Sequence, residues 1–288
     1  MTAWHAWPPD DGREHSVTGR ILHLTGVHSR ALGNRRDLWV CLPAGYESTD
    51  DHYPVLYMQD GQNLFDRAIG FGGQEWGVDE ALAAHAGRAD AIIVAIANAG
   101  DVRINEYSPF RDEGLGGGKG DDYLDFISDV VMPLVDGTFR TRMGAENTFI
   151  GGSSMGGLIA LYAYLTRPDV FGGVAALSPS LWFARRAIFE VLKNTPCRGG
   201  RLYADIGSRE GPAQLLDMAR LRIRLVEKGY RKGRDMVVLM DLGARHEEAA
   251  WARRFPKALR FLVGGAKAGR HPSRKEASHA FRSMLRRG

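Results

Sequence analysis

The stretch of the chain best suited to chemistry is a G-x-S-x-G pattern made by Gly152, Ser154 and Gly156. In such a pattern a serine occupies a sharp turn between a strand and a helix, where its hydroxyl is presented to a substrate. Residues 147–150 favour a short buried strand, and residues 158–165 favour a helix. Because the pattern requires this context, Ser154 is the candidate nucleophile of an acyl-transfer reaction.

A serine hydroxyl is a weak nucleophile at neutral pH, so a nearby base must take its proton. Where this turn carries the nucleophile, the partners follow along the chain in the order acid, then histidine. The histidines downstream of Ser154 are His246, His271 and His279. Only His246 follows a predicted strand and directly precedes a predicted helix, so His246 is the candidate base. The alternative is an ordinary surface histidine at a helix start.

The acid must lie between the serine and the histidine, and residues 202–210 offer Asp205 and Glu210. Glu210 follows the predicted strand, and sites of open α/β sheets gather beyond the carboxyl ends of strands. Asp205 lies within the strand, so Glu210 is the favoured acid. The alternative for Glu210 is a structural acid at the start of a helix, ahead of Pro212.

Acyl transfer also needs donors for the oxyanion that develops on the carbonyl oxygen. One donor is expected from the backbone N–H of Met155, directly after the candidate nucleophile. The second is expected from the loop in residues 57–66, where Gln62 N–H is preferred over Gly61 N–H. Taken alone, this loop would be an ordinary Asp-Gly turn.

Several aromatic and polar side chains lie after predicted strands or in glycine-rich loops, where they would reach a substrate. For each of them, packing or ordinary surface polarity is the alternative explanation. The candidate substrate-binding residues are Trp76, Arg103, Tyr107 and Trp182.

Apolar runs alternate with helical patterns along the chain, which predicts an α/β protein. We expect a mostly parallel central sheet of about eight strands with helices on both faces. The strands are expected at residues 20–29, 37–42, 54–58, 91–96, 148–150, 173–177, 202–206 and 236–240. The helices are expected at residues 78–85, 123–135, 157–166, 185–193, 212–228 and 247–263. Residues 109–120 are glycine-rich and are predicted to form a loop.

The composition suits one large domain, with 44% apolar residues among 288 and a net charge of +4. We expect residues 1–266 to form a single catalytic domain and residues 267–288 to form a basic, flexible tail. The tail is not expected to bind nucleic acid, because basic termini are commonly just solvated. The two cysteines are far apart and offer neither a disulfide framework nor metal-ligand spacing, so no metal and no cofactor is expected.

The N-terminal residues lack the basic start and apolar centre of a secretory signal, and the longest apolar run is too short to span a bilayer. We therefore expect a cytoplasmic protein that does not bind membranes. Its partner is expected to be a small-molecule ester, and its oligomeric state is left open.

These motifs together resemble the Putative esterase family of α/β-hydrolases. The family includes enterochelin esterases, esterase D, feruloyl and acetylxylan esterases, and mycolyltransferases of the antigen 85 group. The resemblance runs from about residue 29 to residue 262. It is carried by residues 42–46, 57–65, 151–157, 176–182 and 207–210, and by His246 followed by Trp251.

The resemblance implies an α/β-hydrolase fold with Ser154, Glu210 and His246 as the triad and an oxyanion hole near Gln62 and Met155. We therefore expect a serine esterase that works through a Ser-His-Glu triad and an acyl-enzyme. One alternative is an acyltransferase that passes the same acyl group to an alcohol. The other is a non-catalytic binding protein with the hydrolase fold, which the presence of all three triad residues disfavours.

Overall fold

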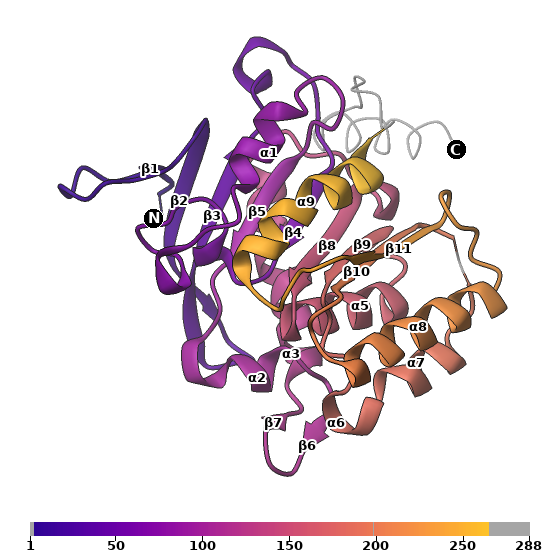
Figure 1. Cartoon of the computed structure of the whole chain (residues 1–288). Helices are drawn as coiled ribbons and strands as arrows, with labels where there is room; N and C mark the ends of the chain where they lie inside the picture. The colour runs from indigo at the N-terminus through magenta and orange to yellow at the C-terminus, as the bar shows by residue number, and fades with distance from the viewer. Residues whose placement is uncertain (1–2, 198, 265–288) are drawn as a thin grey trace, which may run out of the picture.

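A long twisted sheet runs through the molecule and carries helices on both faces (Figure 1). This computed structural model describes residues 3–197 and 199–264. Within them, nine strands form the main sheet, in the order β1-β2-β3-β5-β4-β8-β9-β10-β11. The strands are β1 (His5–Trp7), β2 (Arg20–Ser29), β3 (Asn34–Leu42), β4 (Val55–Met58), β5 (Ile92–Ile96), β8 (Thr148–Ser153), β9 (Gly173–Leu177), β10 (Arg201–Gly207) and β11 (Met236–Asp241).

In this sheet the neighbouring strands β5, β4, β8, β9, β10 and β11 pair in parallel. Strands β1, β2 and β3 add an antiparallel edge. Strands β4, β5, β8 and β9 are buried along their whole length, as expected for strands covered on both faces. The prediction of an α/β fold with a mostly parallel sheet is confirmed. The strand of the main sheet that it missed, β1, has only three residues and no alternating apolar pattern.

Helices cover the sheet on both faces (Figure 1). One face packs against α1 (Val78–Ala84) and α9 (Glu248–Val263). The other face packs against α3 (Gly120–Phe126), α4 (Met132–Thr138), α5 (Met155–Thr166), α7 (Ile188–Asn194) and α8 (Pro212–Glu227). The short helices α2 (Arg103–Glu106) and α6 (Phe183–Arg186) lie near the lower end of the sheet in Figure 1.

Three predicted elements differ from the structure in detail. The helix expected at 123–135 is part of a longer helical run, in which a π-helical segment (Ile127–Val131) joins α3 to α4. The helix expected at 185–193 is split, because Ala184 and Arg185 have positive φ angles inside α6. The predicted loop at 109–120 contains a small hairpin of β6 (Arg111–Asp112) and β7 (Gly116–Gly117).

Helix α9 packs against the sheet through one buried face. Its buried positions follow the spacing of one helical face. They are Ala250, Trp251, Arg254, Phe255, Ala258, Leu259, Leu262 and Val263. Arg254, at 3% exposure, lies among these apolar residues. This face of α9 therefore packs against the sheet and also places a positive charge in the interior.

The predicted basic tail, residues 267–288, lies outside the described residues. In the part of the chain that the structure does describe, none of the helices has the length and apolar character needed to cross a bilayer.

Asp79 is an unusual core residue at the start of α1. It is only 2% exposed, and its Oδ2 accepts a hydrogen bond from Thr18 N at 2.6 Å. Burial, with Glu80 beside it, raises the pKa of Asp79 to about 8. The unfolded carboxyl loses its proton near pH 4, so the folded protein binds one more proton between about pH 4 and pH 8.

We expect Asp79→Asn to become stabilising relative to the wild-type protein as the pH rises from about 4 to about 8. The asparagine keeps an acceptor for Thr18 N but carries no proton to lose. The gain in free energy of unfolding should exceed about 1.4 kcal/mol, the equivalent of one pKa unit. Urea unfolding at several pH values measures it, and the values near pH 4 serve as the internal reference. A difference that does not change with pH would contradict this expectation.

Candidate active site

Ser154 lies at a sharp turn between β8 and α5. Its backbone has φ 56° and ψ −122°, a strained conformation for a residue with a side chain. The two glycines of the pattern permit the close contacts around this turn. A Cβ on Gly152 would lie 2.8 Å from the backbone carbon of Gly156, and one on Gly156 would lie 3.0 Å from Gln59 Cβ. The pattern therefore forms the strand–turn–helix that the sequence predicted.

His246 and Glu210 join Ser154 in a hydrogen-bonded series. His246 Nε2 lies 3.0 Å from Ser154 Oγ, and His246 Nδ1 lies 2.8 Å from Glu210 Oε2. The Glu210 carboxylate accepts a hydrogen bond from Nδ1–H, which leaves Nε2 free to accept the serine proton. The three residues follow β8, β10 and β11, so the parallel sheet brings them together at the carboxyl ends of its strands.

The Glu210 carboxylate is held on both of its oxygens. Its side chain is 2% exposed, and Oε1 accepts hydrogen bonds from Gly207 N and Ser178 Oγ, both at 2.6 Å. Burial alone would raise the pKa of Glu210, but the hydrogen bonds from His246, Ser178 and Gly207 outweigh it and lower the pKa below its ordinary value. The group is therefore suited to remain ionised beside an imidazole.

Asp205, the other acid that the sequence offered, makes different contacts. Its Oδ2 accepts a hydrogen bond from Tyr203 Oη at 2.9 Å, and its Oδ1 lies 3.3 Å from Arg254 Nε. Burial raises the pKa of Asp205 to about 6. The structure thus brings Glu210, rather than Asp205, to His246.

The loop after β4 packs directly on the serine turn. Asp60 has a positive φ of 56°, and the 3₁₀ turn Gly61–Asn63 follows it. Arg103 holds both Asp60 oxygens, with Nε–Oδ1 at 2.6 Å and Nη2–Oδ2 at 2.8 Å. Asn98 Nδ2 adds a hydrogen bond to Oδ1 at 2.7 Å. These contacts fix the loop that carries Gln62, while Met155 begins α5 on the other side of the turn.

The candidate substrate-binding residues separate into two groups. Trp76 is 2% exposed and packs on Trp251 with ring centroids 5.6 Å apart. Tyr107 is fully buried, and its hydroxyl accepts a hydrogen bond from Asp60 N. Trp76 and Tyr107 therefore contact neighbouring protein groups in this structure, and their role in substrate binding stays a prediction. Arg103 is 24% exposed.

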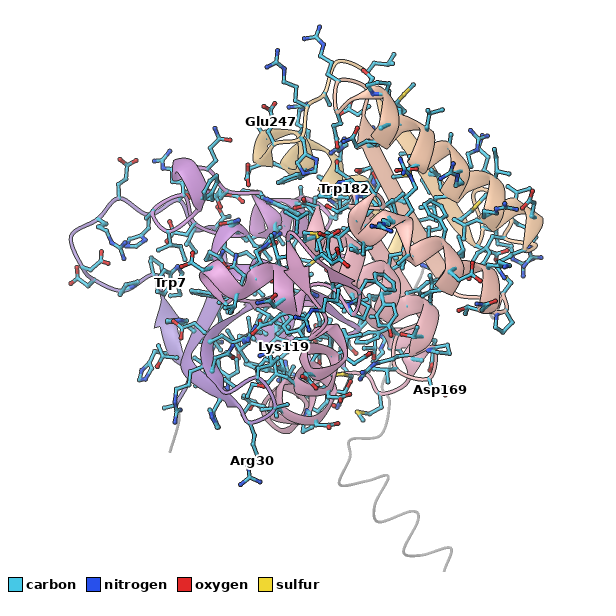
Figure 2. All side chains as sticks on the ribbon, turned by 90° about the horizontal axis from the view of Figure 1, so that it is seen from below. Trp7, Arg30, Lys119, Asp169, Trp182 and Glu247 are labelled. Atoms are coloured by element: carbon cyan, nitrogen blue, oxygen red, sulfur yellow. The ribbon has the colours of Figure 1, made fainter. Side chains whose placement is uncertain are left out.

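Trp182 is the most open of the candidate substrate-binding residues. It is 41% exposed, and its side chain lies near the middle of the view in Figure 2. Glu247, the residue after His246, lies above it in the same view. Trp182 and Arg103 are thus the two candidates whose side chains are partly open to solvent.

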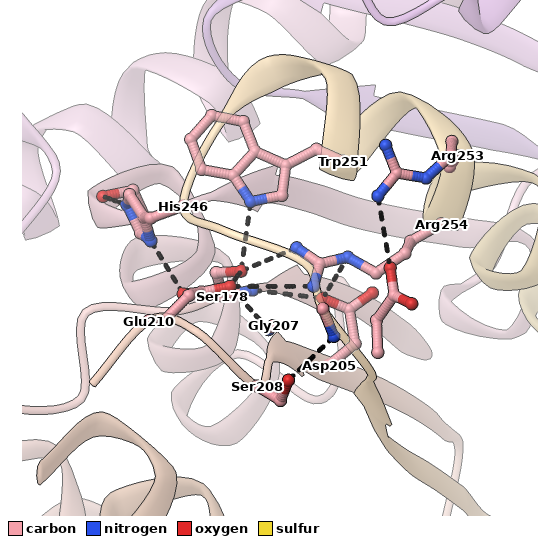
Figure 3. Close-up of polar contacts among 12 residues, drawn as sticks. Ser178, Asp205, Gly207, Ser208, Glu210, His246, Trp251, Arg253 and Arg254 are labelled. Carbon is pink, nitrogen blue, oxygen red and sulfur yellow. Dashed lines mark hydrogen bonds and ion pairs between the residues drawn. The ribbon is translucent and has the colours of Figure 1, made fainter. Parts of the chain in front are cut away.

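Four polar residues around the triad were not identified from the sequence. Ser178, Trp251 and Arg254 lie around Glu210 (Figure 3), and Ser180 Oγ lies 3.3 Å from Ser154 Oγ. Arg254 left a signal in the sequence, since a charged residue occupies a position of the apolar face of α9. The two serines lie in the motif at residues 176–182 that carries the family resemblance, but serine is common in loops, so their type alone did not indicate these contacts.

In the described part of the chain, the side chains grouped closely enough to hold a metal ion are Glu75, Asp79 and Glu80. Their ligand atoms lie within 4.8 Å of one another. Their carboxylates accept hydrogen bonds from Ser16 and Thr18. This group therefore stands apart from the proposed chemistry.

Two relatives illustrate the similarity of the sequence to known proteins. The uncharacterized protein YbbA of Bacillus subtilis is 27% identical over 245 residues, covering 81% of this chain and 94% of the relative. The siderophore triacetylfusarinine C esterase of Aspergillus fumigatus is 34% identical over 149 residues, covering 49% of this chain and 48% of that protein. The second alignment thus spans about half of each chain.

Solved structures share the fold. The BES protein from Bacillus cereus superposes with a TM-score of 0.70 at 20% identity, covering 89% of this chain and 99% of that one. The siderophore hydrolase EstB from Aspergillus nidulans has a TM-score of 0.65 at 22% identity, covering 86% and 97%. At this identity the likeness concerns the architecture alone.

The family assignment rests on the sequence profile of the family described as Putative esterase, which matches residues 29–262. This match covers most of the chain, including the serine turn, the acid and the histidine. The chain belongs to the Putative esterase family, with the α/β-hydrolase fold.

Proposed function

We propose that this protein is a serine esterase that hydrolyses a carboxylic ester through Ser154, His246 and Glu210. The observation that carries the proposal is the hydrogen-bonded series from Ser154 Oγ through the His246 ring to the Glu210 carboxylate. The relatives named as esterases support the same class of reaction.

In the first half of the reaction, Ser154 Oγ attacks the ester carbonyl carbon while His246 Nε2 takes the hydroxyl proton. The carbonyl oxygen becomes an oxyanion, which accepts hydrogen bonds from the backbone N–H groups of Met155 and Gln62. His246 then gives its proton to the departing alkoxide. The carbon–oxygen bond of the ester breaks, an alcohol leaves, and the acyl group stays on Ser154.

In the second half, water replaces the alcohol. His246 Nε2 takes a proton from the water as its oxygen attacks the acyl carbon, and the same amides hold the second oxyanion. His246 returns the proton to Ser154 Oγ, and the carboxylic acid is released. Glu210 holds the imidazole in the required tautomer and stabilises the imidazolium in both halves.

The relatives suggest which esters to test. They include siderophore esterases and an endo-1,4-beta-xylanase/feruloyl esterase. We propose that the substrate is a small ester within this range. A panel of short-chain, aryl, acetyl-sugar and siderophore esters, with alcohol acceptors added in parallel, measures the acyl preference and separates hydrolysis from acyl transfer.

A fluorophosphonate probe should label Ser154 in the folded wild-type protein, because the probe reacts with a serine activated by a base. Peptide mass spectrometry locates the label. Ser154→Ala should lose both the label and the esterase activity, whereas the neighbouring Ser153→Ala should keep the label. Labelling at Ser153, or activity retained in Ser154→Ala, would refute the assignment.

Glu210→Gln should lower kcat by at least about a hundredfold, because an amide can hold the imidazole in the wrong tautomer. Asp205→Asn serves as the matched comparison, since it also neutralises one carboxyl in the same strand–loop segment, and it should lose far less activity. Steady-state kinetics normalised to the labelled fraction measures both. The reverse order of effects would assign the acid to Asp205.

Gly61→Ala should lower kcat by about a hundredfold or more, the typical effect of losing one oxyanion donor. A Cβ at Gly61 would come within 2.6 Å of the backbone of Ala95 and Ile96, so the loop that carries Gln62 must shift. Gly137→Ala is the control, because a Cβ there meets nothing within 4 Å. Wild-type kcat in Gly61→Ala would argue against this loop as a donor.

A further inference from the structure

The connection from β9 to α6 touches both ends of the proposed triad. Ser178 Oγ lies 2.6 Å from Glu210 Oε1, and Ser180 Oγ lies 3.3 Å from Ser154 Oγ. Both serines are buried, at 2% and 3% exposure. Pro179 is the only residue between them, so one short segment contacts the acid and the nucleophile together.

The direction of each hydrogen bond at Ser178 follows from its partners. Trp251 Nε1 lies 3.1 Å from Ser178 Oγ, and Arg254 Nη2 lies 2.8 Å from it (Figure 3). An indole N–H and a guanidinium can only donate, so they occupy the two lone pairs of the hydroxyl. The hydroxyl proton is therefore directed to Glu210 Oε1.

Arg254 is a buried cation between two carboxylates. Its Nε lies 3.3 Å from Asp205 Oδ1, and its Nη1 lies 3.6 Å from Glu210 Oε1. Apolar residues at such a position are often at least as stabilising as a buried ion pair, so packing alone does not account for an arginine. Its contact with Ser178 ties the orientation of that hydroxyl to α9.

The backbone of Ser178, whose hydroxyl contacts Glu210, has an unfavourable conformation. Its φ is +43°, and its N–H donates to Asp205 O at 2.9 Å. Such a conformation is unfavourable for a residue with a side chain and persists only where its surroundings enforce it. Here the strained residue is the one whose hydroxyl meets the acid.

Ser180 has a matching role at the nucleophile. Because His246 Nε2 accepts the Ser154 proton, the contact between the two serines requires Ser180 Oγ to donate to Ser154 Oγ. Ser180 N also donates to the Ser154 carbonyl oxygen at 3.0 Å. Two contacts thus restrict the position of Ser154 relative to the imidazole.

We propose that Ser178 and Ser180 are positioning residues that fix the two ends of the triad. Ser178, oriented by Arg254 and Trp251, holds the Glu210 carboxylate toward His246. Ser180 holds the Ser154 hydroxyl toward the same ring. This inference rests on the proposed esterase function, since it assigns which residues hold Glu210 and Ser154 in position relative to His246.

The test compares Ser178→Ala, Ser180→Ala and Trp251→Phe with Ser29→Ala, which removes a buried hydroxyl from β2. Each protein is titrated with fluorophosphonate so that kcat refers to folded, labelled sites. Ser178→Ala and Ser180→Ala should each lower kcat by about tenfold to a hundredfold, the scale of a misplaced reacting group, and leave KM near the wild-type value. Trp251→Phe keeps the ring and removes one donor, so its loss should be smaller. Ser29→Ala should match the wild-type protein.

The pH dependence of kcat separates positioning from general destabilisation. In Ser178→Ala the Glu210 carboxylate, with His246, Arg254 and Asp205 around it, loses a hydrogen bond to its charged form. The acid limb should therefore move to higher pH, whereas Ser180→Ala should leave it unmoved.

Wild-type kcat and pH dependence in Ser178→Ala, or wild-type kcat in Ser180→Ala, would overturn the proposal. If Ser178→Ala does not fold, an unchanged kcat in Trp251→Phe would overturn the role of Ser178. Activity retained in Ser154→Ala would instead refute the esterase assignment, so the two failures are distinguishable.

Discussion

The site depends on the 2.8 Å hydrogen bond between Glu210 Oε2 and His246 Nδ1. A carboxylate only accepts, so this bond favours the ring proton on Nδ1 and leaves Nε2 as an acceptor facing Ser154 Oγ, as the proposed mechanism requires. Three neighbouring residues contact one partner of this bond. Gly207 N and Ser178 Oγ donate hydrogen bonds to Glu210, and Trp251 packs edge-on against the imidazole.

Parallel pairing explains why such distant residues meet. Ser154, Glu210 and His246 follow β8, β10 and β11, and the strand order of the sheet places these strands near one another with their carboxyl ends at one edge. The loop after β4 joins them because β4 lies beside β8. The fold thus supplies the positions, while the loops supply the chemistry.

Two ion pairs with little exposure to water lie near the proposed site. Arg254 and Asp205 are both nearly inaccessible to water, and each would be costly without the other. Their pairing links α9 to β10, the two elements that flank the Glu210 and His246 loops. Arg103 and Asp60 form a similar pair beneath the loop that carries Gln62. Buried or half-buried pairs therefore brace both the acid side and the oxyanion side of the proposed site.

Local patterns were enough to identify the parallel α/β fold, the serine turn and the order of Ser154, Glu210 and His246. These features leave short-range traces, such as glycines at a tight turn and polar residues after apolar strands. The sequence favoured Glu210 over Asp205 by its place after the strand, but both lie in one segment, and only the direction of their side chains shows which carboxylate meets His246. The burial of Trp76 and Tyr107 was not foreseen from the sequence, since an aromatic ring after a strand packs inward or outward according to neighbours far away in the chain. The contacts of Ser178, Ser180 and Arg254 were decided by tertiary structure alone, because they join residues from different strands, loops and a helix.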